Sequence, residues 1–156
     1  MDRGESVTEL RRCAREILQK EDELNEIVQL VGKDSLAEAD KVCLETARII
    51  KDDFLAQNAF TPYDKTCPLY KSAGMLRNII AFHQLATAAV ERSDGSSSFA
   101  GGNKITFAQI KAQLGDLMYK VSSQKFQDPA DGEETLKKYF GDLNEQISLA
   151  FAQLTE

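Results

Sequence analysis

The sequence predicts an all-α protein, a bundle of about five helices, and two observations support this prediction. Apolar residues recur at spacings of three and four along almost the whole chain, which is the period of a helix that buries one face. No stretch alternates apolar and polar residues between turn signals, as a half-buried strand would. The length of 156 residues suits one domain with its own core. We therefore expect residues 1–156 to form a single helical domain.

The first predicted helix spans about residues 6–31 and carries a stripe of apolar residues that includes Ile27 and Val31. Such a stripe is expected to pack against the core of the domain. Gly32 follows directly, and glycine suits the left-handed backbone conformation that ends many helices. A tight turn is therefore predicted at Gly32.

The second predicted helix spans about residues 36–57. Ser35 and Glu38 have the spacing of a capping box, in which each side chain binds a free backbone N–H group at the start of a helix. Residues 58–68 follow, with two prolines and no helical period. Because proline lacks a backbone donor and restricts the residue before it, we expect an ordered loop there.

Three further helices complete the predicted bundle. The third carries the apolar residues of segment 75–90, and a Ser- and Gly-rich stretch, residues 93–103, indicates a flexible connection after it. Thr106 can cap a fourth helix that continues to about Val121. Asp131 can cap a fifth helix that continues nearly to the last residue.

The composition excludes several classes of function. Asp and Glu outnumber Lys and Arg by 25 to 19, which gives a net charge of −6. Such a field repels nucleic acid and anionic membrane surfaces, so we expect no nucleic-acid partner and no direct membrane contact. The longest apolar runs are only a few residues, whereas a membrane-spanning helix needs roughly 20.

The chain also lacks the residue patterns of common catalytic sites. Its nine glycines never form the Gly-x-x-x-x-Gly-Lys-Ser/Thr pattern that binds phosphate groups. The single histidine, His83, lies on the apolar face of its helix and is interpreted as a hydrogen-bonded core residue. Cys13, Cys43 and Cys67 lack metal-ligand spacing and are expected to be reduced thiols. We therefore predict no catalytic residue and no metal site in this chain.

Two segments suggest a role beyond folding. Residues 34–40 form an acidic turn between the first two helices; the alternative is ordinary capping, because carboxylates in a first turn complement the helix dipole. Residues 58–68 place Phe60 and Cys67 in a non-repetitive loop, which is a more usual location for a binding contact than a helix face. The alternative there is that Phe60 fills the core of the bundle.

Strings of residues in these segments and beyond them resemble one known family. In order, they are Glu-Ile-Val-Gln-Leu-Val-Gly at 26–32, Ile-Lys-Asp-Asp-Phe-Leu-Ala-Gln-Asn-Ala-Phe at 50–60, Thr-Pro-Tyr-Asp at 61–64, Cys-Pro at 67–68, Gly-Met-Leu at 74–76 and Gly-Asp-Leu-Met-Tyr-Lys-Val-Ser-Ser at 115–123. From about Leu10 to its last residue, the chain is similar to the C-terminal helical domain of the catalytic A subunit of vacuolar-type proton-pumping ATPases (V-ATPases). The eukaryotic branch of this family is the more similar one.

The resemblance implies that the chain is a C-terminal fragment of a longer polypeptide, with residues 1–5 an added start. In this family the P-loop, the catalytic glutamate and the magnesium ligand lie in an upstream nucleotide-binding domain. ATP and Mg therefore belong to the full-length catalytic polypeptide. The fragment alone is expected to hold no cofactor and to be inactive.

The full-length A subunit is expected to couple ATP hydrolysis, at its interface with the B subunit, to rotation of the central-stalk rotor subunits and to proton transport. The resemblance thus implies three partners: the B subunit, the rotor subunits and the chain's own upstream nucleotide-binding domain. The implied location is the peripheral V1 sector, on the cytosolic face of vacuolar or endosomal membranes. The alternative function is a free-standing helical adaptor without catalysis.

The resemblance also assigns a role to four residues of the acidic turn. Asp34, Leu36, Glu38 and Asp40 match the pattern of an acidic tip that faces the rotor in related ATPases. The positions between them carry Ser and Ala, so the tip has fewer carboxylates than that pattern. We therefore expect contact through the bulk of the tip rather than a purely electrostatic push.

Two residues of the loop receive roles from the same resemblance. Phe60 matches an aromatic residue that flanks the adenine ring in this family, and an aromatic face suits a purine because stacking and burial dominate such contacts. Cys67 matches a cysteine that is linked to reversible disulfide inhibition with a P-loop cysteine. This chain does not contain the P-loop partner.

Overall fold

The computed structural model describes residues 7–55, 69–95, 105–127 and 129–154. Within these ranges the protein has six α-helices and no strand, so the predicted all-α fold is confirmed. The helices are α1 (Val7–Val31), α2 (Glu38–Ile49), α4 (Leu69–Gly95), α5 (Phe107–Gln113), α6 (Gly115–Ser122) and α7 (Glu133–Leu154). Short 3-10 turns span Lys33–Ser35, Ser123–Phe126 and Pro129–Asp131, and a π-helical segment, Ile50–Leu55, continues α2.

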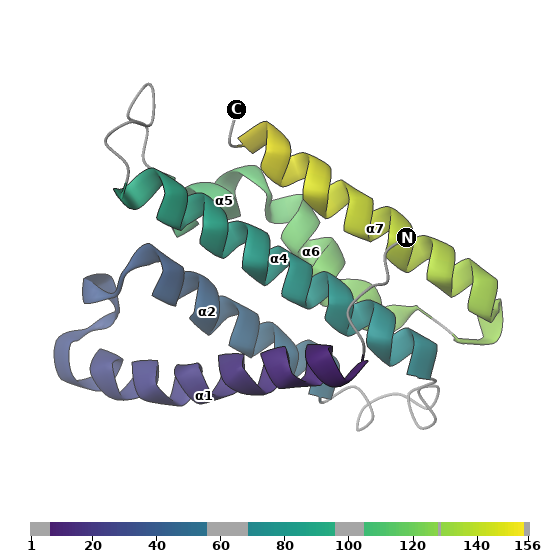
Figure 1. Cartoon of the computed structure of the whole chain (residues 1–156), viewed down its shortest axis with the longest axis horizontal. Coiled ribbons are helices and arrows are strands. Elements are labelled where there is room, and N and C mark those ends of the chain that lie inside the picture. Colours follow the sequence, from purple (N-terminus) through teal and green to yellow (C-terminus); the bar gives the residue numbers. More distant parts are fainter. Residues whose placement is uncertain (1–6, 56–68, 96–104, 128, 155–156) are drawn as a thin grey trace.

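Helix α4 is the central element of the bundle (Figure 1). On one side it packs against α1 and α2, which form a hairpin, and on the other side against α7. The short helices α5 and α6 also contact α4, while α5 reaches α2 and α6 reaches α7. Because α4 has neighbours on both sides, it buries residues around much of its circumference: Met75, Leu76, Asn78, Ile79, Ile80, Phe82, Ala86, Ala89 and Val90.

One hydrophobic core connects all six helices. Leu10 and Ile17 of α1 reach it from one side, and Ile147 of α7 reaches it from the other. The rings of Phe82 and Phe151 meet edge to face, with 5.4 Å between their centroids, and so join α4 to α7. Burial of side chains of this size contributes about 1.5–3 kcal/mol each, which makes this core the main source of stability.

A buried network of side-chain amides also holds α4 against α7. Asn78 donates from Nδ2 to Oε1 of Gln124 (2.9 Å) and to the backbone oxygen of Phe140 (3.0 Å). Its own Oδ1 accepts from Nδ2 of Asn144 (3.0 Å), and Gln124 Nε2 donates to the backbone oxygen of Met75 (3.3 Å). Asn78 and Gln124 are almost fully buried. Because their polar groups are paired, the network specifies one register of the packed helices instead of destabilising the core.

Gly74 allows α4 and α7 to approach closely. A Cβ atom at this position would lie 2.5 Å from Cδ2 of Phe140, well inside van der Waals contact. Phe140 also packs with Met75 and Leu136 in a second small cluster of buried residues. The absence of a side chain at Gly74 is therefore a packing requirement of this helix pair.

Most predicted helices are present, with different bounds. Helix α4 begins at Leu69 and ends at Gly95, so residues 93–95, predicted as the start of a flexible connection, are helical. The predicted fourth helix is two helices, because the backbone of Leu114 leaves the helical region (φ −113°, ψ 26°) between α5 and α6. Residues 96–103 of that connection and the predicted loop at 58–68 lie outside the described residues.

Of the four predicted helix ends, those at Gly32 and Thr106 are confirmed, and those at Ser35 and Asp131 are wrong. Gly32 has φ +90°, the left-handed conformation expected there, and Thr106 forms a capping box with Gln109. Asp131 does not cap α7. It belongs to a 3-10 turn, and Gly132, with φ +105°, stands directly before α7 and accepts the first helical hydrogen bond from Leu136 (3.1 Å). No helix in the described ranges combines the length and the apolar character that a membrane crossing requires.

Candidate functional site

The turn between α1 and α2 is closed by hydrogen bonds that the sequence did not predict. Ser35 donates from Oγ to the backbone oxygens of Gly32 (2.8 Å) and Val31 (3.1 Å), and so binds the free carbonyls at the end of α1. Ala37 takes the position before α2 and provides no side-chain cap. The predicted capping box of Ser35 and Glu38 is therefore wrong, because both side chains have other partners.

Only one of the four residues predicted to face a rotor is exposed in this structure. Leu36 is 7% exposed and belongs to the hydrophobic core. Asp40 is half-buried, and its Oδ1 lies 3.8 Å from Nζ of Lys20 on α1. Glu38 is also half-buried, whereas Asp34 is exposed in the short 3-10 turn. Three of the four therefore hold the turn in place, and Asp34 presents its carboxylate to solvent.

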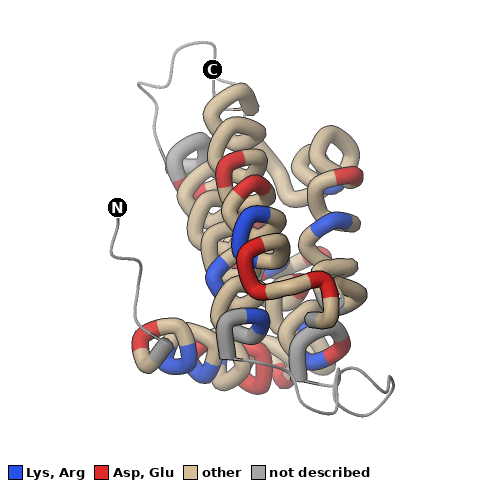
Figure 2. Tube along the Cα trace, turned by 90° about the vertical axis from the view of Figure 1, so that its right-hand side faces the viewer, with Lys and Arg blue, Asp and Glu red and all other residues tan. Residues whose placement is uncertain are grey.

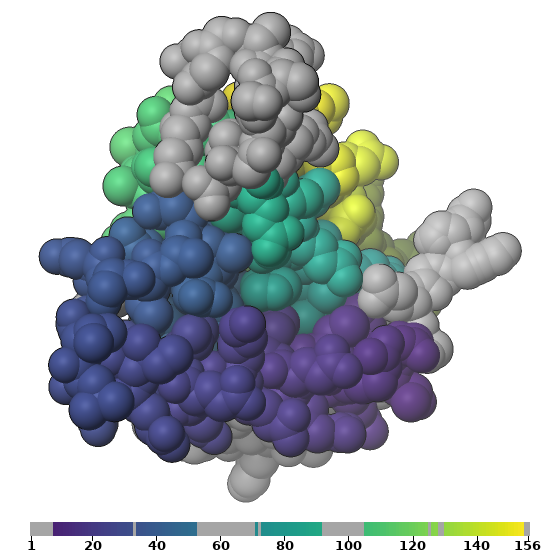
Figure 3. Space-filling model, turned by 60° about the vertical axis from the view of Figure 1, so that its left-hand side comes forward, coloured from purple at the N-terminus to yellow at the C-terminus, as the bar shows by residue number. Residues whose placement is uncertain are grey.

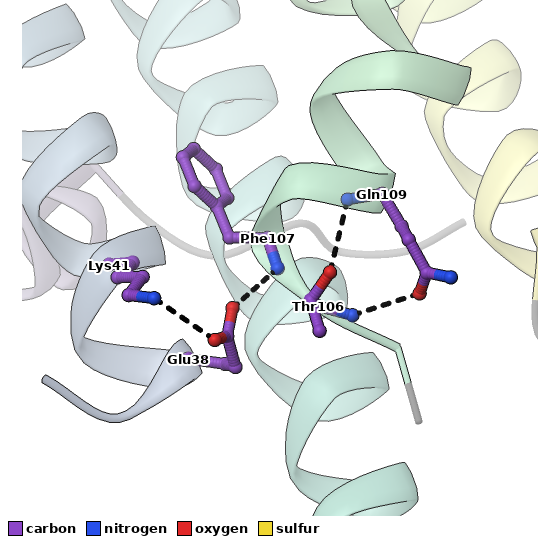
Figure 4. A network of polar contacts seen from close by, with 5 residues as sticks. All are labelled: Glu38, Lys41, Thr106, Phe107 and Gln109. Carbon is purple, nitrogen blue, oxygen red and sulfur yellow. Dashed lines mark hydrogen bonds and ion pairs between the residues drawn. The ribbon is translucent and has the colours of Figure 1, made fainter. Parts of the chain in front are cut away.

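Glu38 joins the hairpin to a distant part of the chain (Figure 4). Its Oε1 accepts from the backbone N–H of Phe107, the first residue of α5, at 2.7 Å, and its Oε2 lies 3.1 Å from Nζ of Lys41. Close by, Thr106 accepts from the N–H of Gln109 (3.2 Å), and Gln109 Oε1 accepts from the N–H of Thr106 (3.1 Å). The start of α5 is thus capped both locally and from α2.

Exposed apolar side chains gather on the last turns of α1. Leu30 is 84% exposed, Val31 is 61% exposed and Ile27 is 43% exposed. Their spacing of three and four residues places them on one face of the helix. We call Ile27, Leu30, Val31 and Asp34 the tip surface. It lies at the α1–α2 turn, at the left edge of the molecule in Figure 1.

The apolar part of the tip surface differs from what the sequence pattern predicts. Ile27 and Val31 belong to the stripe predicted to pack on the core, yet both side chains are exposed at the end of α1. The sequence does contain one sign of an exposed apolar surface, because Leu30 is a large apolar residue that lies outside that stripe. From the opposite end of the molecule, acidic and basic residues are seen interspersed along the helices (Figure 2).

A cavity of about 360 Å³ lies where α1, α2 and α4 meet, on the face shown in Figure 3. Its lining includes two thiols and one imidazole, from Cys13, Cys43 and His83. It also includes Thr87, whose buried hydroxyl has no hydrogen-bond partner among the described residues. This volume lies at the small end of the range for small-molecule sites, which begins at about 300 Å³.

The chemistry of this cavity does not resemble that of a nucleophilic site. Burial raises the pKa of the Cys43 thiol to about 11, and its Sγ donates weakly to the backbone oxygen of Ile17 (3.7 Å). Burial also lowers the pKa of His83, so that the imidazole is neutral at neutral pH. Cys43 is therefore a protonated thiol and lacks the thiolate that cysteine chemistry requires.

His83 has the hydrogen-bonded position that its apolar helix face predicted. Its Nδ1 lies 3.2 Å from Oγ1 of Thr46 on α2. The Thr46 hydroxyl donates its only proton to the backbone oxygen of Val42 (2.9 Å), so its oxygen accepts from His83. This assigns the ring proton to Nδ1 and makes His83 a link between α4 and α2.

The remaining predicted site residues, Phe60 and Cys67, lie outside the described residues. In the part of the chain that is described, no group of three or more His, Cys, Asp or Glu side chains could hold a metal ion. The described candidate site is therefore the tip surface, supported from within by Leu36, Glu38 and Asp40.

Comparison with known protein families identifies the type of domain. Residues 4–99 match the model of the family described as the C-terminal domain of V and A type ATP synthase, which covers more than half of the chain. The chain belongs to this family. The resemblance that the sequence strings indicated is confirmed.

Curated relatives of the family are catalytic subunits of V-type proton ATPases. The catalytic A subunit, isoform 1, of the Acetabularia acetabulum enzyme is 61% identical over 94% of this chain and 24% of its own length. The catalytic A subunit of the Beta vulgaris enzyme is 57% identical over 95% of this chain and 23% of its own length. That of Dictyostelium discoideum is 51% identical over 94% and 23%. The chain thus spans about a quarter of the length of these relatives.

Proposed function

We propose that this chain is the C-terminal domain of the catalytic A subunit of a V-type proton ATPase. The observation that carries the proposal is the 61% identity over 94% of the chain to a catalytic polypeptide of that enzyme class. In this role the domain links ATP hydrolysis, performed with Mg in the rest of the polypeptide, to rotation and proton transport. The relatives are long catalytic polypeptides, which disfavours a free-standing adaptor.

The proposed assembly defines the partners of the domain. They are its own nucleotide-binding domain, the B subunit at the hydrolysis site and the rotor subunits of the central stalk. The domain would act in the peripheral V1 sector, on the cytosolic face of a vacuolar or endosomal membrane. Phe60 is proposed to flank the adenine ring, and Cys67 to be the cysteine of a disulfide switch with the P-loop.

Within this function, we propose that the tip surface is the rotor contact. Exposed apolar side chains that gather on one face are typical of a surface covered by a partner. Leu30 and Val31 offer such a surface beside the carboxylate of Asp34. The contact is therefore mainly steric, and a swing of the domain displaces the rotor by repacking an apolar face against it. Leu36, Glu38 and Asp40 support this surface from beneath instead of touching the rotor.

Substitution of Leu30 tests this assignment in the intact ATPase. Because Leu30 is 84% exposed, Leu30→Asp should change the free energy of unfolding by no more than about 0.5 kcal/mol. We expect it to lower the ratio of protons pumped to ATP hydrolysed, since a charge replaces the apolar contact. The measurement is proton uptake and phosphate release on the same vesicles.

A matched control lies on another helix. Leu149 of α7 is 62% exposed, so Leu149→Asp introduces the same charge at a similarly exposed position. We expect this variant to keep the wild-type pumping ratio. An unchanged ratio in Leu30→Asp would refute the rotor contact at the tip surface.

A further inference from the structure

The contact between Glu38 and Phe107 connects residues that are 69 positions apart. Glu38 is the first residue of α2 and lies four positions after Asp34 of the tip surface. Phe107 is the first residue of α5. Figure 4 shows the carboxylate of Glu38 directed away from its own helix and toward the start of α5. It is a helix cap supplied by a distant element of the fold.

The cap satisfies a donor that α5 cannot satisfy by itself. The first N–H groups of a helix have no partner within the helix. In the capping box, the Thr106 side chain accepts from the N–H of Gln109, and the Gln109 side chain accepts from the N–H of Thr106. The N–H of Phe107 has no partner in this box, and Glu38 accepts from it. A hydrogen bond to an ionised carboxylate is roughly twice as strong as a neutral one.

The surroundings of Glu38 favour a persistent contact. Only 18% of its side chain is exposed, so solvent and salt screen it less than they screen a surface ion pair. Both of its oxygens have partners, because Oε2 pairs with Lys41 while Oε1 binds Phe107. The carboxylate is therefore held between α2 and α5.

At its other end the contact is anchored in the body of the domain. Phe107 is 9% exposed and Ile110 is fully buried, so α5 is fixed in the core. From α6, which follows directly, Lys120 donates to Oε1 of Gln146 on α7 (3.0 Å). The start of α5 is thus anchored in the core and is connected through α6 to α7.

We propose that Glu38 is a positioning residue that fastens the tip surface to the C-terminal half of the domain. Through its bond to the start of α5, the α1–α2 hairpin and the α5–α7 region move as one body. Without this bond, force on the tip would bend the hairpin before it moved the rest of the domain. The mechanical consequence depends on the proposed function, whereas the bond itself can be tested on the chain alone.

Amide hydrogen exchange of the 156-residue chain measures the bond directly. Glu38→Ala should raise the exchange rate of the Phe107 amide about tenfold, because a hydrogen bond to a charged group is lost. The Gln109 amide, which Thr106 caps locally, should keep its protection. Glu38→Gln retains an acceptor and should restore part of the protection at Phe107. Unchanged exchange at Phe107 in Glu38→Ala would overturn the proposal.

Two control variants separate the bond from its neighbours. Lys41→Ala removes the ion pair of Glu38 but leaves Oε1 able to accept from Phe107, so the Phe107 amide should stay protected. Thr106→Ala removes a local cap of the same helix without touching the hairpin, and should expose the Gln109 amide instead. If Glu38→Ala exposes both amides equally, α5 has opened as a whole and the proposal is refuted.

The second readout is the ratio of protons pumped to ATP hydrolysed in the intact ATPase. Glu38→Ala should lower this ratio about twofold or more, with Glu38→Gln intermediate and Thr106→Ala unchanged. If Leu30→Asp lowers the ratio and Glu38→Ala does not, the positioning role is refuted while the rotor contact stands. If neither variant lowers it, the proposed rotor contact is refuted together with any mechanical role of Glu38. If Thr106→Ala and Glu38→Ala lower it equally, the stability of α5 is responsible and the positioning role is refuted.

Discussion

The α1–α2 hairpin and the α4–α7 pair are held in contrasting ways. Between α4 and α7, a glycine allows close approach, a paired amide network fixes the register and two phenylalanine rings meet. Between the hairpin and α4 there is a cavity of about 360 Å³, and the hairpin ends in exposed apolar side chains. The α4–α7 pair is thus the more densely packed part of the domain, and the hairpin is packed less closely against α4.

The largest effect is expected where the dense region loses its polar network. Asn78→Ala removes three hydrogen bonds and leaves polar groups of buried Gln124 and Phe140 and of half-buried Asn144 without this partner. We expect the free energy of unfolding to fall by about 3 kcal/mol, as measured by urea denaturation. Gln84→Ala, an exposed amide on the same helix, is the control and should change it little. Equal effects of the two variants would contradict the structural role of the network.

A smaller effect is expected from two glycines inside helices. Gly74→Ala places a Cβ against Phe140, and overpacking of this kind costs about 1–3 kcal/mol, partly offset by about 1 kcal/mol of helix propensity. A Cβ at Gly141 of α7 would meet no atom within 4 Å. Gly141→Ala should therefore raise the free energy of unfolding by about 0.5–1 kcal/mol. Thermal unfolding should therefore show a lower melting temperature for Gly74→Ala and a higher one for Gly141→Ala. Equal shifts in melting temperature would mean that α4 and α7 are not closely packed at Gly74.

A further effect is expected in the hairpin and depends on pH. The pKa of Cys43 is raised to about 11 by burial, so the folded state keeps its proton at a pH where the unfolded state releases it. The stability that this provides is complete below the pKa of the unfolded thiol, about 8.5, and is lost as pH rises toward 11. Urea denaturation between pH 8 and 10 should show the decrease.

The thiol variants separate this decrease from other alkaline effects. Cys43→Ala should flatten the dependence of stability on pH, whereas Cys13→Ala leaves the buried thiol in place and should keep the wild-type slope. Burial also raises the pKa of Tyr139, and this contribution is common to the wild type and both variants. The same slope in Cys43→Ala and the wild type would contradict burial of the Cys43 thiol.

The sequence predicted those features of the fold that depend on interactions between residues close together in the chain. The apolar period located α1, α2, α4 and α7, and the capping box of Thr106 and Gln109 depends on neighbours in the chain. The break after α5 was missed because Leu114 continues the apolar stripe, although Gly115 beside it was a usable signal. The π-helical segment Ile50–Leu55 has no such signal, since its residues also suit an α-helix.

The turn that carries the candidate site was predicted in position, but its contacts were not. The acidic segment correctly marked the turn, and Asp34 is exposed as expected. The partners of Ser35 and Glu38 could not be predicted, because one bonds back to α1 and the other bonds to α5 across 69 positions. Which apolar residues remain uncovered at the end of α1 depends on where the neighbouring helices lie, and this is a property of the assembled bundle.

The long separation of Glu38 and Phe107 also bears on the order in which the domain folds. Closing a loop of this length is entropically costly, so local helix turns form before the contact does. The Thr106–Gln109 box can form as soon as α5 nucleates, whereas the cap from Glu38 must wait for the hairpin to dock. The start of α5 is therefore completed late, and substitutions at Glu38 should speed unfolding more than they slow folding.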